Sequence, residues 1–196
     1  MRGAAAARVI AIAAPPGGGK TTLSGLLSAR LGGCPVLHFD DHEVATRRAP
    51  AEVAAWLDRG APLEEIAAPG FAEGLSELRG SDAAHILVDG PLGRAYPRTA
   101  HLIDLVIYID TPLDLALARV MGGQAAHAAR ALEPGAPRQF AQWLEAYLEN
   151  YQGFIRRSYA MQRAVVLPGA DVVLDGALPM ERLVDLALDA INGRRS

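Results

Sequence analysis

Cysteine and lysine are almost absent from this 196-residue sequence, which contains one of each, Cys34 and Lys20. A single cysteine cannot form a disulfide within the chain, and nothing around it suggests a metal site or a nucleophile. Free cysteines usually behave as small apolar side chains. We therefore expect Cys34 to be a small buried residue.

Long apolar runs are missing as well. No stretch approaches the roughly 20 apolar residues that cross a bilayer, so no membrane partner is expected. The start, MRGAAAARVIAIAA, combines a basic residue with an apolar run as a signal peptide does, but it leads directly into a glycine-rich loop. Since cleavage there would remove that loop, a cytoplasmic enzyme is the expectation.

A surplus of positive charge is absent too, because the formal net charge at pH 7 is -3. Sequence-independent binding to nucleic acid depends on excess Lys and Arg facing phosphates, so no nucleic-acid partner is expected. The length and the lack of repeats or a long linker predict one domain over residues 1–196. The choice between a monomer and a homodimer stays open.

The scarcity of lysine is informative because the chain has 19 Lys and Arg residues, all arginine except Lys20. Where arginine serves as well as lysine, this sequence uses arginine. We infer that position 20 requires a compact ammonium group on a flexible stem. Such a group fits between phosphate oxygens where a broad planar guanidinium does not.

Short apolar runs alternate with helix-like segments along the whole chain, which predicts a parallel sheet with helices on both faces. In such folds, ligands bind beyond the carboxyl ends of the strands. The expected strands are 8–13, 35–39, 85–90, 104–110 and 170–176. The expected helices are 20–31, 50–60, 69–80, 111–121, 138–163 and 179–193, with Thr111 as a cap, and residues 122–137 have the composition of a mobile loop.

The stretch APPGGGKTTL follows the first expected strand and opens the first expected helix. It matches the phosphate-binding loop Gly-x-x-x-x-Gly-Lys-Ser/Thr except that Ala14 replaces the first glycine. Glycines let backbone amides approach a phosphate closely, and the helix dipole adds positive potential there. Lys20 would bridge the β- and γ-phosphates, and Thr21 would hold Mg²⁺. The expected nucleotide-binding residues are Gly17, Gly18, Gly19, Lys20, Thr21 and Thr22.

The motif predicts a three-layer P-loop fold with a five-stranded parallel sheet in the order 2-3-1-4-5. Two P-loop classes are disfavoured. A GTPase needs a guanine-reading Asn-Lys-x-Asp motif, and this chain has no second lysine for it. A transporter-type ATPase has a Leu-Ser-Gly-Gly-Gln signature ahead of its second Asp motif. Here the only similar stretch, MGGQ, comes after the strand that ends at Asp89.

The order of the remaining segments resembles the uridine kinase and phosphoribulokinase family of small-molecule kinases, from about residue 8 to residue 177. The segments that carry the resemblance are PPGGGKTTL, HFDDHE, ILVDG, DLVIYIDTPLDLALAR and VLPGADVVLDG. The resemblance implies ATP and Mg²⁺ as cofactors, a mobile lid and a catalytic base after the second strand. The paired lid arginines of the family are not matched, because Val120 follows Arg119 and the next arginine is Arg130.

The candidate catalytic residues follow from what a kinase must do, which is to align an alcohol with the γ-phosphate and screen its charge. We expect Asp40 to accept the hydroxyl proton, with Asp41 as the alternative. Asp89 would bind a water of Mg²⁺. Arg119 would neutralise the transferring phosphoryl group.

The acceptor side is less well defined by the sequence. Asp41, His42, Arg94 and Tyr96 are the candidate substrate-binding residues, and His127 and Arg130 are candidate lid residues, with a surface helix as the equal alternative. The aromatic residues at helical spacing from position 140 are expected to lie in the core rather than to stack on a base: Phe140, Trp143, Tyr147 and Tyr151.

These observations predict an ATP-dependent kinase that phosphorylates a hydroxyl of a small metabolite such as a nucleoside, a sugar or a pantothenate-like alcohol. The alternatives are a kinase that acts on a phosphate, as nucleoside monophosphate kinases do, and a nucleotide-binding regulatory protein without turnover.

Overall fold

The computed structural model describes residues 6–44, 48–131, 133 and 135–193. The expected lid at 122–137 includes residues 132 and 134, which lie outside the described residues. In the described part of the chain, no helix is long and apolar enough to cross a membrane.

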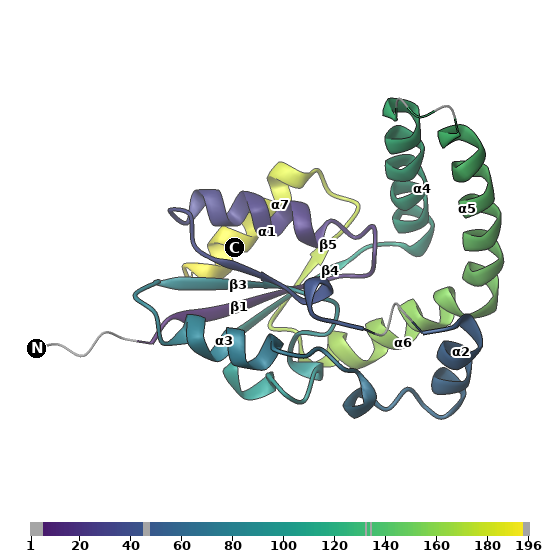
Figure 1. Cartoon of the computed structure of the whole chain (residues 1–196). Helices are drawn as coiled ribbons and strands as arrows, with labels where there is room; N and C mark the ends of the chain where they lie inside the picture. Colours follow the sequence, from purple (N-terminus) through teal and green to yellow (C-terminus); the bar gives the residue numbers. More distant parts are fainter. Residues whose placement is uncertain (1–5, 45–47, 132, 134, 194–196) are drawn as a thin grey trace, which may run out of the picture.

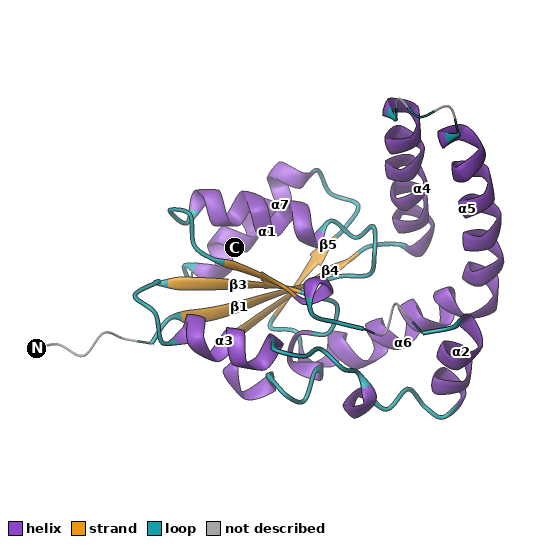
Figure 2. Ribbon diagram, viewed as in Figure 1, coloured by secondary structure: helices purple, strands orange, loops and turns teal. Residues whose placement is uncertain are grey.

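Five parallel strands form one sheet in the order β2-β3-β1-β4-β5, which confirms the predicted topology. Figure 2 shows the strands as a single twisted layer with helices on either side. The strands are β1 (Arg8–Ala13), β2 (Val36–His38), β3 (His85–Asp89), β4 (Leu105–Asp110) and β5 (Val172–Asp175).

Within the described residues, seven α-helices surround or extend from this sheet (Figure 1). They are α1 (Lys20–Arg30), α2 (Pro50–Asp58), α3 (Phe71–Arg79), α4 (Leu113–Arg130), α5 (Ala136–Asn150), α6 (Arg156–Val166) and α7 (Met180–Ile191). A 3₁₀ turn, η1 (Phe39–Asp41), follows β2, and another, η4 (Gly93–Ala95), follows β3.

The sheet separates two apolar cores. On one face α1 and α7 pack against alternate strand residues, among them Ile10 and Ile107, and on the other face α3 and α6 cover Ala11 and Val106. Because successive strand residues point to opposite faces, central strands buried on both faces have nearly continuous apolar sequences. This is why β1 and β4 were readable from the sequence.

The segment expected to be a mobile loop is mostly helical. Helix α4 continues through Gly122 and Gly123 to Arg130, and only residues 131–135 separate it from α5. Each interior glycine costs about 1 kcal/mol relative to alanine, but the stretch that follows is rich in alanine, the best helix former. The two helices therefore form a hairpin that projects from the sheet, hereafter the α4–α5 hairpin (Figure 1).

The helix expected over 138–163 is divided. A π-helical turn, Tyr151–Ile155, joins α5 to α6 and contains Gly153. The chain changes direction here, so that α6 returns from the α4–α5 hairpin to the sheet (Figure 1). Turns of this kind break the regular hydrogen-bond ladder, which hydrophobic periodicity does not reveal.

Cys34 is only partly buried, beside the core under α1 and α7. This differs from the expected full burial because the residue precedes a short edge strand. Desolvation raises the pKa of its thiol, which keeps it protonated and unreactive at neutral pH.

Candidate active site

The glycine-rich loop between β1 and α1 has the backbone shape that binding of a phosphate requires. Gly17 and Gly19 have φ angles of 78° and 92°, in the left-handed region where other residues are strained. A Cβ on Gly17 would collide with the backbone oxygen of Ala116 in α4. The loop therefore packs directly against the first turns of the α4–α5 hairpin, and glycine is required at position 17 on two grounds.

The substitution of alanine for the first motif glycine is accommodated in the core. Ala14 is fully buried and its methyl group lies under Gly18, where a Cβ would come within 2.6 Å of it. The Gly18 amide donates to the carbonyl of Pro15 at 2.8 Å, and the Gly18 carbonyl accepts from the Thr111 hydroxyl at 3.3 Å. Thr111 thus supports the phosphate loop; it does not cap α4, whose first residue is Leu113.

The amino end of α1 faces the space enclosed by this loop. Helix α1 begins at Lys20 and has no acidic residue in its first turn. The first N–H groups of any helix lack partners within the helix, and the helix dipole makes that end positive. An anion between the loop and α1 would therefore meet the N–H groups at the start of the helix and no carboxylate from the first turn of α1 itself.

The lysine and the expected base lie side by side. Lys20 Nζ is 3.9 Å from Asp40 Oδ2, although the two residues come from different loops. The lysine side chain is 11% exposed and the aspartate side chain is 70% exposed. The carboxylate can therefore reach an acceptor arriving from solvent while it remains next to the group expected to hold the terminal phosphates.

The neighbours of Asp40 point in different directions. Asp41 is exposed at the end of η1. His42 Nδ1 lies 3.1 Å from the carbonyl of Pro69, and its ring packs edge-on against Phe71. Of these two aspartates, Asp40 forms the ion pair with Lys20.

Asp89 is the most buried carboxylate of the site, with 3% exposure at the end of β3. His38 Nδ1 donates to its Oδ2 over 2.9 Å. Its Oδ1 is buried and has no hydrogen-bond partner among the described residues. An orphaned carboxylate oxygen costs free energy, and a water on a divalent cation is a fitting partner for it, as is the Thr21 hydroxyl for the cation itself.

His38 was not singled out by sequence reasoning. A signal was present, because His38 and Asp89 are the last residues of two neighbouring strands. Their Cα atoms are paired in the parallel register of β2 and β3. That both residues end a strand predicts a contact only when the two strands are known to be neighbours, and the sequence indicates the strand order only indirectly.

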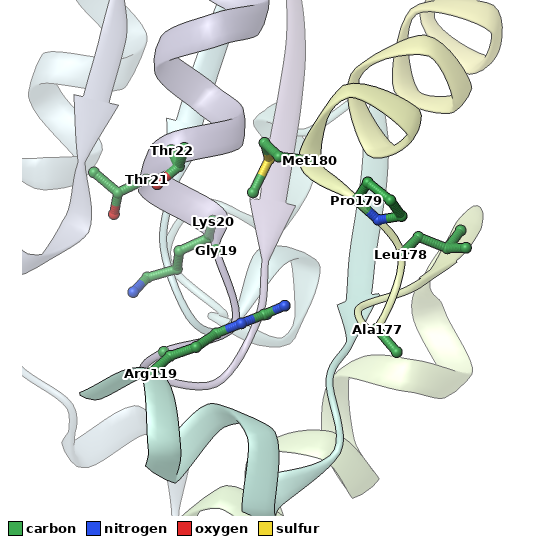
Figure 3. A pocket seen from close by; sticks show the side chains of 10 residues that line it. Gly19, Lys20, Thr21, Thr22, Arg119, Ala177, Leu178, Pro179 and Met180 are labelled. Carbon is green, nitrogen blue, oxygen red and sulfur yellow. The ribbon is translucent and has the colours of Figure 1, made fainter. Parts of the chain in front are cut away.

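A cavity of about 650 Å³ opens beside the phosphate loop (Figure 3). Gly17, Gly19, Lys20, Thr21 and Thr22 line one side, and the loop after β5 lines the other with Ala177, Leu178, Pro179 and Met180. Arg119 of α4 closes the lower part in this view. The loop residues 177–180 were missed by the sequence analysis because an apolar loop carries no motif.

Arg119 lines the same cavity as Lys20, from the opposite direction. Its guanidinium donates to the carbonyl of Gly176 at 3.1 Å, and its side chain extends toward Ala177, away from the Lys20 side chain (Figure 3). Helix α4 passes under the phosphate loop and directs this residue toward β5. The expected role of Arg119 beside the transferring phosphoryl group stays a prediction.

Arg94 is held away from the carboxyl edge of the sheet. It donates to the carbonyls of Ile103, Asp104 and Gly169, and it forms an ion pair with Asp171 at 2.8 Å. These partners precede β4 and β5, at the amino ends of the strands. Arg94 therefore links the segments that precede β4 and β5. The structure does not bring it to the carboxyl edge, where a substrate site is expected.

Tyr96 is part of the core, with 2% exposure. Its hydroxyl donates to the carbonyl of Ile66, and its ring packs against Phe39 and Phe71 with centroids 5.2 and 6.2 Å apart. This aromatic cluster supports η1, which carries Asp40. The contribution of Tyr96 is thus to the placement of the candidate base, not to direct contact with a substrate.

The outer part of the α4–α5 hairpin holds the remaining candidates. His127 lies in the last turns of α4 and lines a cavity of about 500 Å³ with Phe140 and Trp143 of α5. Arg130 is the last residue of α4. Neither residue lines the cavity beside the phosphate loop.

The aromatic stripe of α5 is a continuous row of rings, partly exposed rather than fully in the core. The pairs Phe140–Trp143, Trp143–Tyr147 and Tyr147–Tyr151 have centroids 5.0–6.3 Å apart. The row ends at buried Tyr159 of α6, whose hydroxyl lies 3.1 Å from that of Tyr147. Burial raises the pKa of Tyr159 well above its ordinary value, so it stays neutral.

Fold and loop together define a P-loop protein with the sheet order of the small-molecule kinases. No family model matches the chain, and no curated protein matches it. Three similar solved structures are a shikimate kinase from Aquifex aeolicus, a possible uridine kinase from Bacillus stearothermophilus and a deoxyadenosine kinase from M. mycoides.

The likeness to these structures extends over most of each chain. For the shikimate kinase, identity is 18%, the TM-score is 0.50, and 94% of this chain and 96% of that chain are covered. For the possible uridine kinase the values are 17%, 0.53, 87% and 90%. For the deoxyadenosine kinase they are 15%, 0.51, 94% and 99%. At such identities the comparisons show the fold, and they do not single out the uridine kinase-like family.

Proposed function

We propose that this protein is an ATP-dependent phosphotransferase that moves the γ-phosphoryl group to a hydroxyl of a small metabolite. The observation that carries the proposal is the pair formed by Lys20 and Asp40, 3.9 Å apart at the mouth of the phosphate loop. It joins a phosphate-binding cation to a solvent-facing carboxylate, the two groups that phosphoryl transfer to an alcohol needs.

The nucleotide would lie along the cavity of about 650 Å³. Its phosphates would bind the amides of the loop and the Lys20 ammonium. Its base would lie between the Arg119 side chain and the loop that contains Pro179, where a planar cation and an apolar ring offer two faces. We therefore assign Arg119 to the base end of the nucleotide.

Thr21 and Asp89 are the residues that would hold Mg²⁺, the threonine directly and the carboxylate through a water. When bound, the cation neutralises charge on the phosphate oxygens. The protein's own part is to keep these groups fixed, since Thr21 belongs to the first turn of α1 and Asp89 is locked by His38.

The acceptor hydroxyl would approach from the side of η1. Asp40 would take its proton as the hydroxyl oxygen bonds to the γ-phosphorus and the bond from that phosphorus to the β–γ bridging oxygen breaks, which releases ADP. Near this carboxylate lie Asp41 and His42, and Arg94 is committed to the opposite edge of the sheet. This surrounding favours a hydroxyl acceptor such as a nucleoside, a sugar or a pantothenate-like alcohol. It disfavours a phosphate acceptor, because such sites use arginines.

The α4–α5 hairpin is the segment we propose as the lid. It begins directly under the phosphate loop, where Ala116 packs on Gly17. A shift of the hairpin would therefore move the loop that is proposed to bind the phosphates. Exclusion of water during transfer needs a cover of this kind.

A screen tests the proposed activity. Thermal shift and coupled ADP release are measured with Mg²⁺ and ATP against nucleosides, sugars, vitamins and aminoglycosides. A hydroxyl compound that raises the melting temperature and stimulates ADP release supports the proposal, since only ligands of the folded state stabilise it. ATP binding with no stimulation by any acceptor would favour the regulatory protein, and stimulation only by nucleoside monophosphates would favour the phosphate-directed kinase.

A further inference from the structure

We propose that His38 is a positioning residue for the divalent cation of the nucleotide, and that it acts by fixing the carboxylate of Asp89. This inference rests on the proposed function and deepens it. It assigns a role to a side chain of β2 that lies outside the P-loop motif.

The sheet register brings the two residues together. His38 and Asp89 end neighbouring parallel strands and are paired Cα to Cα. Val36 and Leu87, two residues earlier on each strand, pack into the core under α1. Because side chains alternate between faces, His38 and Asp89 also point toward the α1 face, where α1 begins with Lys20.

The hydrogen bond defines the state of the ring. A carboxylate can only accept, so the proton of the 2.9 Å contact lies on Nδ1 of His38. This bond leaves Asp89 with one oxygen held and the other, Oδ1, buried without a partner among the described residues. The carboxylate therefore cannot rotate to exchange its oxygens without losing its one side-chain partner.

A purely structural role would not need this arrangement. Buried carboxylates are costly unless their oxygens are satisfied, and an apolar pair at these positions would extend the core of Val36 and Leu87 without that cost. The His38 side chain is 40% exposed, so it lies at the border of the site. The half-satisfied carboxylate would gain its second partner when a hydrated cation arrives, and His38 fixes the orientation in which the carboxylate receives it.

The test compares nucleotide affinity with and without the cation. Calorimetry measures ADP binding to the whole protein in EDTA and in Mg²⁺, and the ratio of the two dissociation constants gives the gain due to the cation. Loss of a residue that orients a metal-binding carboxylate typically costs about 10- to 100-fold in metal affinity. We expect His38→Ala to reduce the gain by about tenfold while the affinity in EDTA stays within about twofold of the wild type.

Two conservative variants provide the matched control. In His38→Asn the amide nitrogen takes the place of Nδ1 and can donate to Oδ2, whereas in His38→Gln the amide lies one bond farther out. We expect the asparagine variant to recover most of the cation gain and the glutamine variant to recover little. This comparison remains decisive if the alanine variant fails to fold.

The outcomes separate this inference from the proposed function. If His38→Ala and His38→Gln both keep the cation gain of the wild type, the role of His38 is overturned and nucleotide binding stands. The same holds if the ADP affinity of the wild type is equal in EDTA and in Mg²⁺. An equal loss in EDTA and in Mg²⁺ also overturns it, because that pattern marks general damage. No ADP binding to the wild type under either condition overturns the proposed function itself, and this inference with it.

Discussion

The nucleotide side and the acceptor side of this protein are built in different ways. The phosphate loop is a run of consecutive residues whose binding groups are backbone amides, and its glycines are fixed by φ angles and by the approach of Ala116. The proposed acceptor side draws on η1 and on the α4–α5 hairpin as its proposed lid, two segments that lie far apart in the sequence. Its groups are side chains, and each one's role depends on what else it contacts.

This difference explains why two arginines could not be placed from the sequence. The sequence makes Arg94 a candidate for the acceptor site and Arg119 a candidate for the phosphoryl group. In the structure both donate to backbone carbonyls: Arg94 to Ile103 and Asp104, and Arg119 to Gly176. A guanidinium has five donors and satisfies buried carbonyls as readily as phosphates. Residue type alone therefore does not define an acceptor site.

The largest expected effect is the loss of activity when the proposed nucleotide side is altered at Lys20. Lys20→Ala removes the only lysine, and with it the ammonium next to the terminal phosphates. We expect acceptor-stimulated ADP release to fall by about 10³-fold or more, since one preorganised donor contributes roughly 10²- to 10³-fold and here charge neutralisation is lost too. Lys20→Arg, in which charge remains but the planar group does not fit, should recover little. Turnover unchanged in either variant would remove the phosphate-loop assignment.

The second prediction concerns a change on the proposed acceptor side that leaves nucleotide binding in place. Asp40→Asn keeps the shape of the side chain but cannot accept a proton, so kcat should fall by about 10²- to 10⁴-fold. ATP affinity, measured by calorimetry, should stay within about threefold, because we assign the carboxylate to the acceptor and not to the nucleotide. Asp41→Asn is the matched control one residue away. A loss in Asp41→Asn without a loss in Asp40→Asn would show that the neighbouring carboxylate is the base.

These two positions also mark how far sequence reasoning reached. The P-loop motif and the positions of the strands follow from local patterns, namely apolar runs that end in glycine or aspartate and a helix that opens with Lys20. Both are properties of contiguous residues, whereas the strand order was predicted from the fold that the motif indicates. The contact between Lys20 and Asp40 was predictable in outline, since parallel strands place their carboxyl ends at one edge.

What could not be predicted depends on contacts between distant segments. Residues 177–180 line the nucleotide cavity only because β5 lies beside β4, and the buried state of Tyr96 depends on Phe39 and Phe71 from two other elements. The helical course of 122–130 was missed because glycines were given more weight than the alanines around them. In each case tertiary packing or summed propensity outweighed the local signal.

A smaller effect sharpens the description of the nucleotide side. Arg119→Ala should weaken ATP and ADP binding by about tenfold each, the order of a cation–π contact plus a lost contact with the base. The kcat at saturating ATP should change little, because we assign the guanidinium, which is held at Gly176, to the base end of the nucleotide. Calorimetry and steady-state kinetics measure the two effects. A large drop in kcat with unchanged affinity would return Arg119 to the phosphoryl group.

Arg94→Ala tests the opposite edge of the sheet. The variant removes donors to three carbonyls and the partner of Asp171. We expect about 1–3 kcal/mol less stability in denaturant unfolding, the range for hydrogen bonds that involve a charged group. KM for the acceptor and ATP affinity should be unchanged at a temperature where the variant is folded. A raised KM for the acceptor with normal stability would place Arg94 in the substrate site after all.

The smallest effect concerns the joint between the two sides. Arg163 of α6 donates two hydrogen bonds to the Asp110 carboxylate at the end of β4, at 2.8 and 2.7 Å. This pair ties the helix that returns from the α4–α5 hairpin to the strand that leads into it. The hydrogen bonds from Arg163 lower the pKa of Asp110, so the pair stabilises the folded state above the ordinary aspartate pKa of about 4.

The pH dependence follows from that direction. The stabilisation should be fully present from about pH 5 to 8 and should disappear as the pH falls below about 4 through the lowered pKa of Asp110. The wild type should therefore melt slightly higher than Asp110→Asn at neutral pH, and the two melting temperatures should converge in acid. Other carboxylates titrate in both proteins and cancel in the difference. A gap that persists unchanged to pH 2.5 would mean that the asparagine alters packing rather than the ion pair.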